Sequence, residues 1–402
     1  MFILTWIIFL GKIFLKSSEF KICLEIKLLF LLFCVSFTGY FFCPEYYYDF
    51  QPLVKQGIMF LTVIAFVLLT YNSHLGIDKI MKWTTVIVIF FTLLEIAYLF
   101  FDVDLGYKTI AYLKEEVGRS FSDVKGGIES VGKESSHFSN ILLPVIFYWL
   151  SRYLFKKSFL DLLLFGILLL FLMLTNSQGG AFAFLVGLVG LLALFLKVKK
   201  KDIKIQVAKV ILIFSFGFPV LLIHFFRQID TIVKFATGRA DMTKRVSDLT
   251  RSNYILSGLD IYKDNILFGT GFGMSRAHYP NYFKKYPYSF INGNMGEAGS
   301  LSDLDFGNIV IRFLAETGTV GTLLLVLFLA SIYIKIFKIS HKSYINTFLF
   351  LSLTSLYASF IGFGAISFFH WWFIFAVSLK AIYQEPEVIR GGYVTNEVVS
   401  WS

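Results

Sequence analysis

Three polar side chains share one face of a helix expected near residue 310, and they are the first candidates for chemistry. Asn308, Arg312 and Glu316 are spaced four residues apart, which places them one above another on a helix. Charged groups inside a membrane span are costly and are functional by default. An arginine can bind phosphate oxygens, and a carboxylate can take a proton from an attacking hydroxyl. The alternative is an ion pair between Arg312 and Glu316 within the helix.

Other ionisable groups precede this helix. Asp303 and Asp305 are suited to the N-terminus of a helix, where carboxylates are favoured. A D-x-D pair could also hold a divalent cation, but no further acidic cluster supports that interpretation. His278 could act as a general base, or it is an ordinary loop residue.

A second group of candidates lies in a polar segment from Arg227 to Phe306. The apolar spacing after Arg251 indicates an amphipathic helix on the outer membrane surface. The glycines of Gly269-Thr-Gly271-Phe-Gly273 then end this helix and let backbone approach a ligand closely. The segment is rich in arginine, including Arg251, Arg239 and Arg245, which indicates an anionic ligand.

Two further polar features have structural alternatives. Gln178 lies in a tight turn, Thr175-Asn-Ser-Gln-Gly-Gly180, which is either a plain hairpin or a polar wall facing the large loop. Tyr282 belongs to an aromatic stretch, for which packing on the bilayer surface is the structural alternative.

The composition places these candidates in a membrane protein. Of 402 residues, 56% are hydrophobic and only 16% are charged, whereas soluble domains carry about 25% charged residues. The net charge of +10 does not indicate nucleic acid, because the lysines fall in short loops between apolar runs, where they set topology. The three cysteines show no disulfide or zinc spacing.

The apolar runs predict an all-α polytopic protein with about ten or eleven spans. The basic loop Lys197–Lys204 is assigned to the cytoplasm, and the other short basic loops then fall on the same side. The expected regions are N-terminal helices over 1–226, a large outside loop over 227–306 with amphipathic helices, C-terminal helices over 307–382 and a cytoplasmic tail over 383–402. The expected spans are 28–43, 57–71, 84–101, 138–155, 159–175, 180–196, 207–226, 308–334, 345–362 and 365–382, with 2–15 as a doubtful eleventh.

These motifs in this order resemble the O-antigen ligase and polymerase superfamily over residues 137–335. The family pattern has an asparagine at the start of a span (Asn140), a Ser-Arg-Gly turn (Ser177-Gln178-Gly179), a loop arginine before a G-x-G-x-G stretch, and His-Asn…Glu-x-Gly. Arg251, Asn308 and Glu316 occupy matching positions. Two positions depart from the pattern, since Gln178 replaces the turn arginine and Gly307 replaces the histidine.

The resemblance implies a metal-independent, cofactor-free glycosyltransferase with a GT-C-like fold in the bacterial inner membrane, its site facing the periplasm. It implies as catalytic residues Arg251, Arg312, Asp303, Asp305, Glu316 and His278, and as substrate-binding residues Arg239, Arg245, Gln178, Asn308, Gly269, Gly271 and Tyr282.

The two departures favour a Wzy-type polymerase of O-antigen or capsule repeat units over a ligase to lipid A core. Its substrates would be undecaprenyl-pyrophosphate-linked oligosaccharides, its surroundings membrane lipids, and its partners a chain-length regulator and a flippase. A flippase or transporter is the alternative from another class, but the cations gather in the outside loop rather than in the spans.

Overall fold

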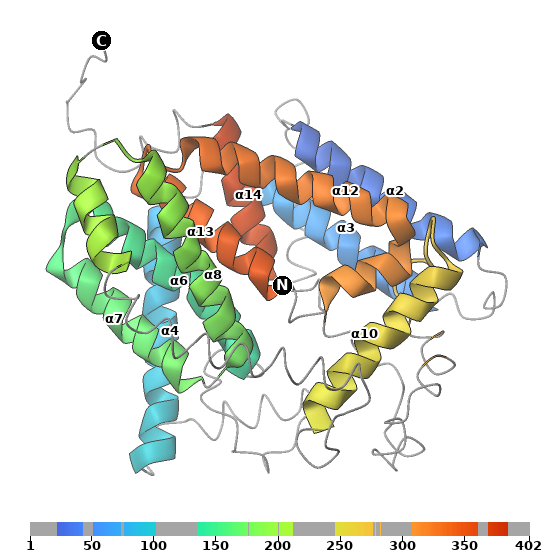
Figure 1. The fold of residues 1–402 in the computed structure, drawn as a ribbon, viewed down its shortest axis with the longest axis horizontal. Coiled ribbons are helices and arrows are strands. Elements are labelled where there is room, and N and C mark those ends of the chain that lie inside the picture. The colour runs from blue at the N-terminus through green and yellow to red at the C-terminus, as the bar shows by residue number, and fades with distance from the viewer. Residues whose placement is uncertain are drawn as a thin grey trace. The chain divides into compact units, whose positions relative to one another are not determined.

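The computed structural model describes residues 22–42, 51–73, 76–101, 135–175, 177–199, 201–211, 246–275, 278, 282, 308–360 and 369–384. Every extended regular element in these ranges is an α-helix (Figure 1). Besides a helix over 201–211, they are α2 (Leu24–Phe42), α3 (Gln51–Tyr71), α4 (Ile77–Phe101), α6 (Ser135–Lys156), α7 (Phe159–Leu174), α8 (Gln178–Lys197), α10 (Val246–Asp264), α12 (Ile309–Ile339), α13 (Tyr344–Ser359) and α14 (Phe369–Tyr383).

Six of these helices are long and apolar enough to cross a membrane, which confirms the prediction of an all-α polytopic membrane protein. They are α2, α3, α4, α6, α8 and α12. Three other predicted spans correspond to shorter helices, α7, α13 and α14, of 16, 16 and 15 residues. Of the span expected over 207–226 only 207–211 is described, and the segment 2–15 lies outside the described residues.

The chain forms two compact units, each built from separate parts of the sequence. The first comprises Met1–Leu68, Ala208–Tyr333 and Leu356–Trp372. Its core is aromatic: the ring of Phe60 lies 5.4 Å from that of Phe272 and 6.5 Å from that of Trp372. Such pairs add specific edge and face contacts to the gain from burying large apolar side chains.

The second unit comprises Leu69–Val207, Ile334–Ser355 and Phe373–Ser402. Helix α6 packs against α4, α7 and α8, and α7 also contacts α8. The close contact of α6 with α8 depends on small residues, because a Cβ at Gly180 would lie 2.4 Å from the Cβ of Ser139, and one at Gly187 would lie 2.2 Å from the Phe147 ring. Close helix approach through small residues is typical of membrane interiors.

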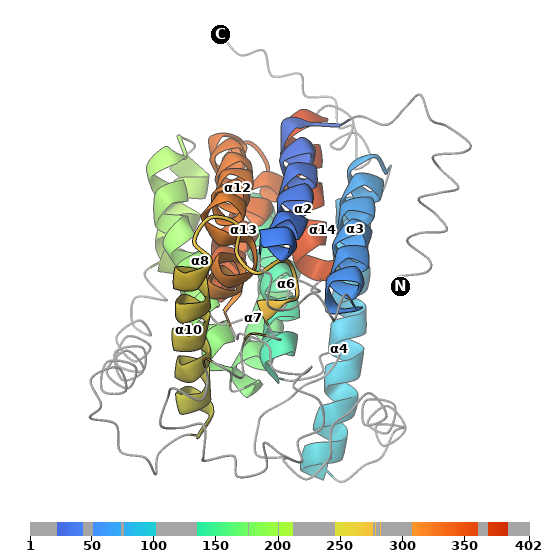
Figure 2. The ribbon, with the colours of Figure 1, turned by 90° about the vertical axis from the view of Figure 1, so that its right-hand side faces the viewer.

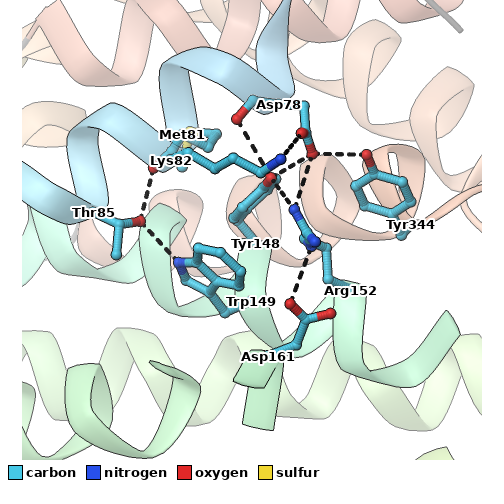
Figure 3. A network of polar contacts seen from close by, with 9 residues as sticks. All are labelled: Asp78, Met81, Lys82, Thr85, Tyr148, Trp149, Arg152, Asp161 and Tyr344. Atoms are coloured by element: carbon cyan, nitrogen blue, oxygen red, sulfur yellow. Dashed lines mark hydrogen bonds and ion pairs between the residues drawn. The ribbon is translucent and has the colours of Figure 1, made fainter. Parts of the chain in front are cut away.

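A polar network, which we call the Asp78 joint, ties the ends of four helices of the second unit together (Figure 3). It consists of Asp78, Lys82, Tyr148, Arg152, Asp161 and Tyr344. One carboxylate oxygen of Asp78 accepts hydrogen bonds from Tyr148 at 2.5 Å, Tyr344 at 2.8 Å and Arg152 at 3.3 Å. The other oxygen lies 2.5 Å from the Lys82 amine. The sequence analysis did not find this joint.

Arg152 extends the joint to a second carboxylate. Its Nε lies 3.3 Å from an oxygen of Asp161, whose side chain is 1% exposed. The guanidinium also covers the Trp149 ring at 4.9 Å, and the Trp149 indole N–H donates to Thr85 at 2.8 Å. The joint therefore links α4, α6, α7 and α13 through hydrogen bonds and ion pairs.

Candidate functional site

The predicted span that starts at residue 308 is interrupted inside the first unit. Helix α12 has non-helical backbone at Gly318, with φ 63° and ψ −162°. One regular span was predicted here over 308–334, and the break at Gly318 corrects that prediction. A broken helix leaves carbonyls of its first part and N–H groups of its second part without helical partners. Inside a membrane such groups must find partners within the protein.

A loop that follows α10, residues 265–275, supplies these partners; we call it the glycine loop (Figure 2). The N–H groups of Thr270 and Gly271 donate to the carbonyls of Ala315 and Glu316 at 3.0 and 2.9 Å. In the opposite direction, carbonyls of the loop accept from the second part of α12. Thr319 N–H donates to Ile266 at 2.8 Å, and Val320 N–H donates to Leu267 at 3.2 Å.

Glycines make this interlock possible, because backbone meets backbone at each contact. A Cβ at Gly318 would lie 2.4 Å from the Leu267 oxygen, and one at Gly269 would lie 2.4 Å from the Glu316 carbonyl carbon. Gly269, Gly271 and Gly318 also have positive φ angles of 66°, 94° and 63°, which other residues rarely adopt.

The close approach expected at the glycine loop is thus made to protein backbone. Gly271 faces Tyr40 of α2, since a Cβ there would lie 2.9 Å from the Tyr40 nitrogen. The N–H of Phe272 also donates to the Ser36 carbonyl of α2 at 2.8 Å. These contacts explain the glycines without a ligand, and the role of Gly269 and Gly271 in substrate binding stays a prediction.

A buried charged cluster lies directly before the break. The Nε of Arg312 donates to one oxygen of Glu316 at 3.2 Å, and the hydroxyl of Ser275 donates to the other at 2.6 Å. Arg312, Glu316 and Ser275 are 2%, 1% and 0% exposed. The guanidinium also lies 5.8 Å from the centre of the Phe272 ring, within the range of a cation–π contact. The ion pair considered from the sequence is present, and it is held by the glycine loop.

Asn308 is the N-cap of α12. Its side-chain oxygen accepts from the N–H groups of Val310 and Ile311 at 2.9 and 3.1 Å. Asparagine is among the best residues at this position, because its oxygen replaces a missing helical acceptor. The i, i+4, i+8 spacing therefore includes a capping residue, and the binding role expected for Asn308 stays a prediction.

His278 and Tyr282 follow the glycine loop. The His278 side chain is buried, and burial lowers the pKa of its imidazole from 6.5 to about 4. The ring is therefore neutral at pH 7, and it is no stronger a base than an ordinary carboxylate. The hydroxyl of Tyr282 donates to the carboxylate of Asp264 at the end of α10.

Arg251 lies in α10, and its side chain is outside the described part of the structure. The helix expected around it is present and ends at Asp264, directly before the glycine loop. Its apolar side chains are not gathered on one face, so the amphipathic character expected for it is not a property of the helix as a whole. The other candidates Arg239, Arg245, Asp303 and Asp305 lie outside the described residues.

The Gln178 turn belongs to the second unit. Ser177 caps α8, since its hydroxyl accepts from the N–H of Gly180 at 3.2 Å, and it also bonds the Ser139 hydroxyl of α6 at 3.0 Å. Gln178 is the first residue of α8, and its side chain is outside the described part. The contribution of Gln178 to a binding site stays a prediction.

Residues 163–326 match the model of a protein family described as O-antigen ligase. This part of the chain is therefore similar to the O-antigen ligase family. The matched segment lies within residues 137–335, where the motifs indicated the resemblance, and it contains both the Gln178 turn and the Arg312–Glu316 cluster. None of the curated proteins compared with the chain matches it.

Members of the O-antigen ligase family are glycosyltransferase-like enzymes that act on lipid-linked glycans. The Arg312–Glu316 cluster provides a guanidinium and a carboxylate that are suited to such a reaction. Both groups are buried away from water, where electrostatic interactions and hydrogen bonds are stronger. Among the described residues, no group of three His, Cys, Asp or Glu side chains could hold a metal ion.

The sequence analysis missed Ser275, which orients Glu316. The signal available for it was its place directly after the G-x-G-x-G stretch. Because the Ser275–Glu316 contact joins residues 41 positions apart, helical spacing could not predict it.

Proposed function

We propose that this chain polymerises the repeat units of an O-antigen or a capsular polysaccharide. It would transfer a glycan from undecaprenyl pyrophosphate en bloc to an incoming lipid-linked repeat unit, at the periplasmic face of the inner membrane. The observation that carries the proposal is the buried Arg312–Glu316–Ser275 cluster inside the segment that is similar to the O-antigen ligase family.

In the proposed reaction, a hydroxyl of the acceptor sugar attacks the anomeric carbon of the donor glycan. A glycosidic C–O bond forms while the C–O bond to pyrophosphate breaks, and the electron pair leaves with undecaprenyl pyrophosphate. The proton of the hydroxyl passes to a base. The enzyme must therefore stabilise the charge on the pyrophosphate and receive one proton.

Arginines are suited to the first task, because a guanidinium binds phosphate oxygens in a bidentate manner. We assign it to Arg251, with Arg239, Arg245 and Arg312 in support. Arg312 lies on the helix that the glycine loop fixes, so its position is set by two segments of the chain. Its neighbour Glu316 would keep the guanidinium oriented while both are withdrawn from water.

For the second task, Glu316 is the candidate carboxylate that the structure describes, and Ser275 and Arg312 hold its two oxygens. Asp303 and Asp305 are the alternatives. His278 has lost the advantage in basicity that an ordinary histidine holds over a carboxylate. We therefore propose a carboxylate as the base, with a metal-independent mechanism.

A ligase that moves finished glycan to lipid A core is the second candidate, since the matched family is described as O-antigen ligase. Gln178 and Gly307 stand where the ligase pattern has an arginine and a histidine, and this difference supports the polymerase. The two functions differ in the product of a deletion strain. Loss of a polymerase leaves single repeat units on the surface lipid, whereas loss of a ligase leaves long glycan on its carrier.

Proteoliposomes with purified lipid-linked repeat units test the proposal directly. We expect the wild-type chain to form glycans of increasing length and Arg251→Ala to lose this activity by about 10²-fold or more. Lys263→Ala is the matched control, because Lys263 is an exposed cation on the same helix whose ion pair with Asp260 contributes little. Full activity of Arg251→Ala would remove that residue from the site.

A further inference from the structure

A group of four lysines lies at the ends of α8 and α12. Lys197 and Lys199 lie at the end of α8, whereas Lys338 and Lys342 lie at the end of α12 and in the turn after it. All four belong to the second unit. We call these four residues the lysine patch.

The structure brings these side chains within electrostatic reach of one another. Lys197 donates its amine to the Phe337 carbonyl and lies 4.3 Å from the centre of the Phe337 ring, so the end of α8 meets the end of α12. His341 lies in the turn after α12. Burial, together with the charges of Lys197, Lys342 and Lys199, lowers the pKa of its imidazole. The charge of Lys338 also acts on Lys197.

Three of the four lysines are not neutralised by an acidic side chain among the described residues. Asp202, the one acidic residue in the described helix over 201–211, lies 3.3 Å from Lys157. Lys197, Lys199 and Lys338 have no acidic partner among the described residues. The carbonyls at the helix C-termini stabilise these cations only in part. Excess positive charge on several segments attracts an anion that can reach them together.

Apolar side chains lie exposed beside the patch. On α8, Val189, Leu192 and Leu196 are 51%, 47% and 82% exposed and are spaced to share one helix face. On α12, Ile334 is 53% exposed, one turn before Lys338. An occupant that combines an anionic head with long apolar chains matches both features, whereas an acidic protein segment matches only the charge.

We propose that the lysine patch binds the headgroup of an anionic phospholipid, whose acyl chains lie along α8 and the end of α12. Under the topology expected from the basic loops, the patch faces the cytoplasmic leaflet. Clusters of lysine directly next to membrane helices bind anionic lipids in this way. The proposal goes beyond glycan transfer and does not depend on it.

Native mass spectrometry of the purified full chain, with phosphatidylglycerol or phosphatidylcholine added, tests the proposal. We expect phosphatidylglycerol to bind more tightly, and the double variant Lys199→Gln/Lys338→Gln to lose roughly 25-fold in affinity, because each lysine contributes about a factor of five. The matched control is Lys27→Gln/Lys79→Gln, which removes two exposed lysines expected on the same side of the membrane. This control should bind as the wild type does.

Several outcomes would overturn the proposal. Equal binding of the two lipids, or an equal loss in both double variants, would show that the lysines only set topology. Binding of glycerol 3-phosphate as tight as that of phosphatidylglycerol would indicate a soluble phosphate ligand. Tight binding of a polyglutamate peptide without lipid preference would indicate an acidic protein partner. Protease accessibility of the C-terminal tail in membrane vesicles checks that the variants keep the wild-type orientation.

Discussion

A partly buried arginine, Arg152, and a buried one, Arg312, meet carboxylates in contrasting ways. Arg152 of the Asp78 joint contacts Asp78 on α4 and Asp161 on α7, so it connects separate helices (Figure 3). Arg312 pairs with Glu316 one turn further along its own helix. The first arrangement determines how helices pack, whereas the second adds nothing to helix packing by itself.

The backbone around the two arginines also differs. Arg152 lies in continuous helix, and Asp78 has donors on both of its carboxylate oxygens. Arg312 lies beside a break in α12, and a serine from a distant loop fixes its carboxylate. Irregular backbone inside a membrane is tolerated where it is buried in protein, and it often marks a site. A buried arginine with carboxylates is therefore no indication of function until its backbone is considered.

The largest effect is expected from breaking the Asp78 joint. Arg152→Met should lower the free energy of unfolding by about 3 kcal/mol, because Asp161 would be left buried and unpaired. Thermal unfolding in detergent measures the loss. The double variant Arg152→Met/Asp161→Leu should recover most of it. If the Arg152→Met protein is stable but cannot transfer glycan, the Asp78 joint takes part in the reaction, and Arg152 and Arg312 do not differ in role.

Arg312→Lys should affect activity more than stability. A lysine keeps the charge but lacks the planar fork of the guanidinium, so we expect transfer to fall by about 10²-fold. The reaction rate in proteoliposomes gives the activity, and the unfolding midpoint gives the stability. If the midpoint falls strongly while the remaining folded protein keeps its full rate, Arg312 is structural in the same way as Arg152.

Gly318→Ala tests whether the break itself matters. The alanine would have to adopt φ 63° and ψ −162°, a conformation that is essentially restricted to glycine and costs on the order of 1–3 kcal/mol, and its Cβ would meet the Leu267 oxygen. We expect a lower unfolding midpoint and reduced transfer. Gly166→Ala on α7 is the control, since a Cβ there meets nothing within 4 Å. Equal behaviour of the two variants would mean that α12 does not need its break.

The smallest expected effect is a dependence on pH through His278. Its pKa is about 4 in the folded chain and 6.5 in the unfolded chain, so the unfolded chain binds the proton first as the pH falls. Stability is therefore full above pH 6.5 and decreases toward pH 4. His278→Phe should make the unfolding midpoint less dependent on pH between pH 4 and pH 6.5. An unchanged slope would assign the acid sensitivity to groups other than His278.

The sequence predicts those parts of the molecule that depend on local patterns. Apolar runs located the helices, and the spacing of Arg312 and Glu316 placed them in contact. The end of α10 before the glycine loop followed from Gly269, because a glycine with positive φ does not continue a helix.

The features that were missed are contacts between distant segments. The role of Asp78 could not be predicted because its partner Tyr344 lies 266 residues away. The lysines near Asp78 in the sequence were used only to assign the topology. The break at Gly318 depends on the glycine loop, which replaces the helical hydrogen bonds. Hydrophobic periodicity carries no information on such pairings, because the sequence of each segment alone is compatible with a regular helix.

The glycine loop has a consequence for the order in which the chain assembles. Its hydrogen-bond partners are Ser36 on α2 and Ala315 and Glu316 on α12, and α12 is synthesised after the loop itself. Until the loop docks, the first part of α12 has no substitute for its missing backbone partners, and a continuous helix is the state that hydrocarbon tolerates. We therefore expect the helix to insert unbroken and to open at Gly318 only on docking, so that the site would form after insertion rather than during it.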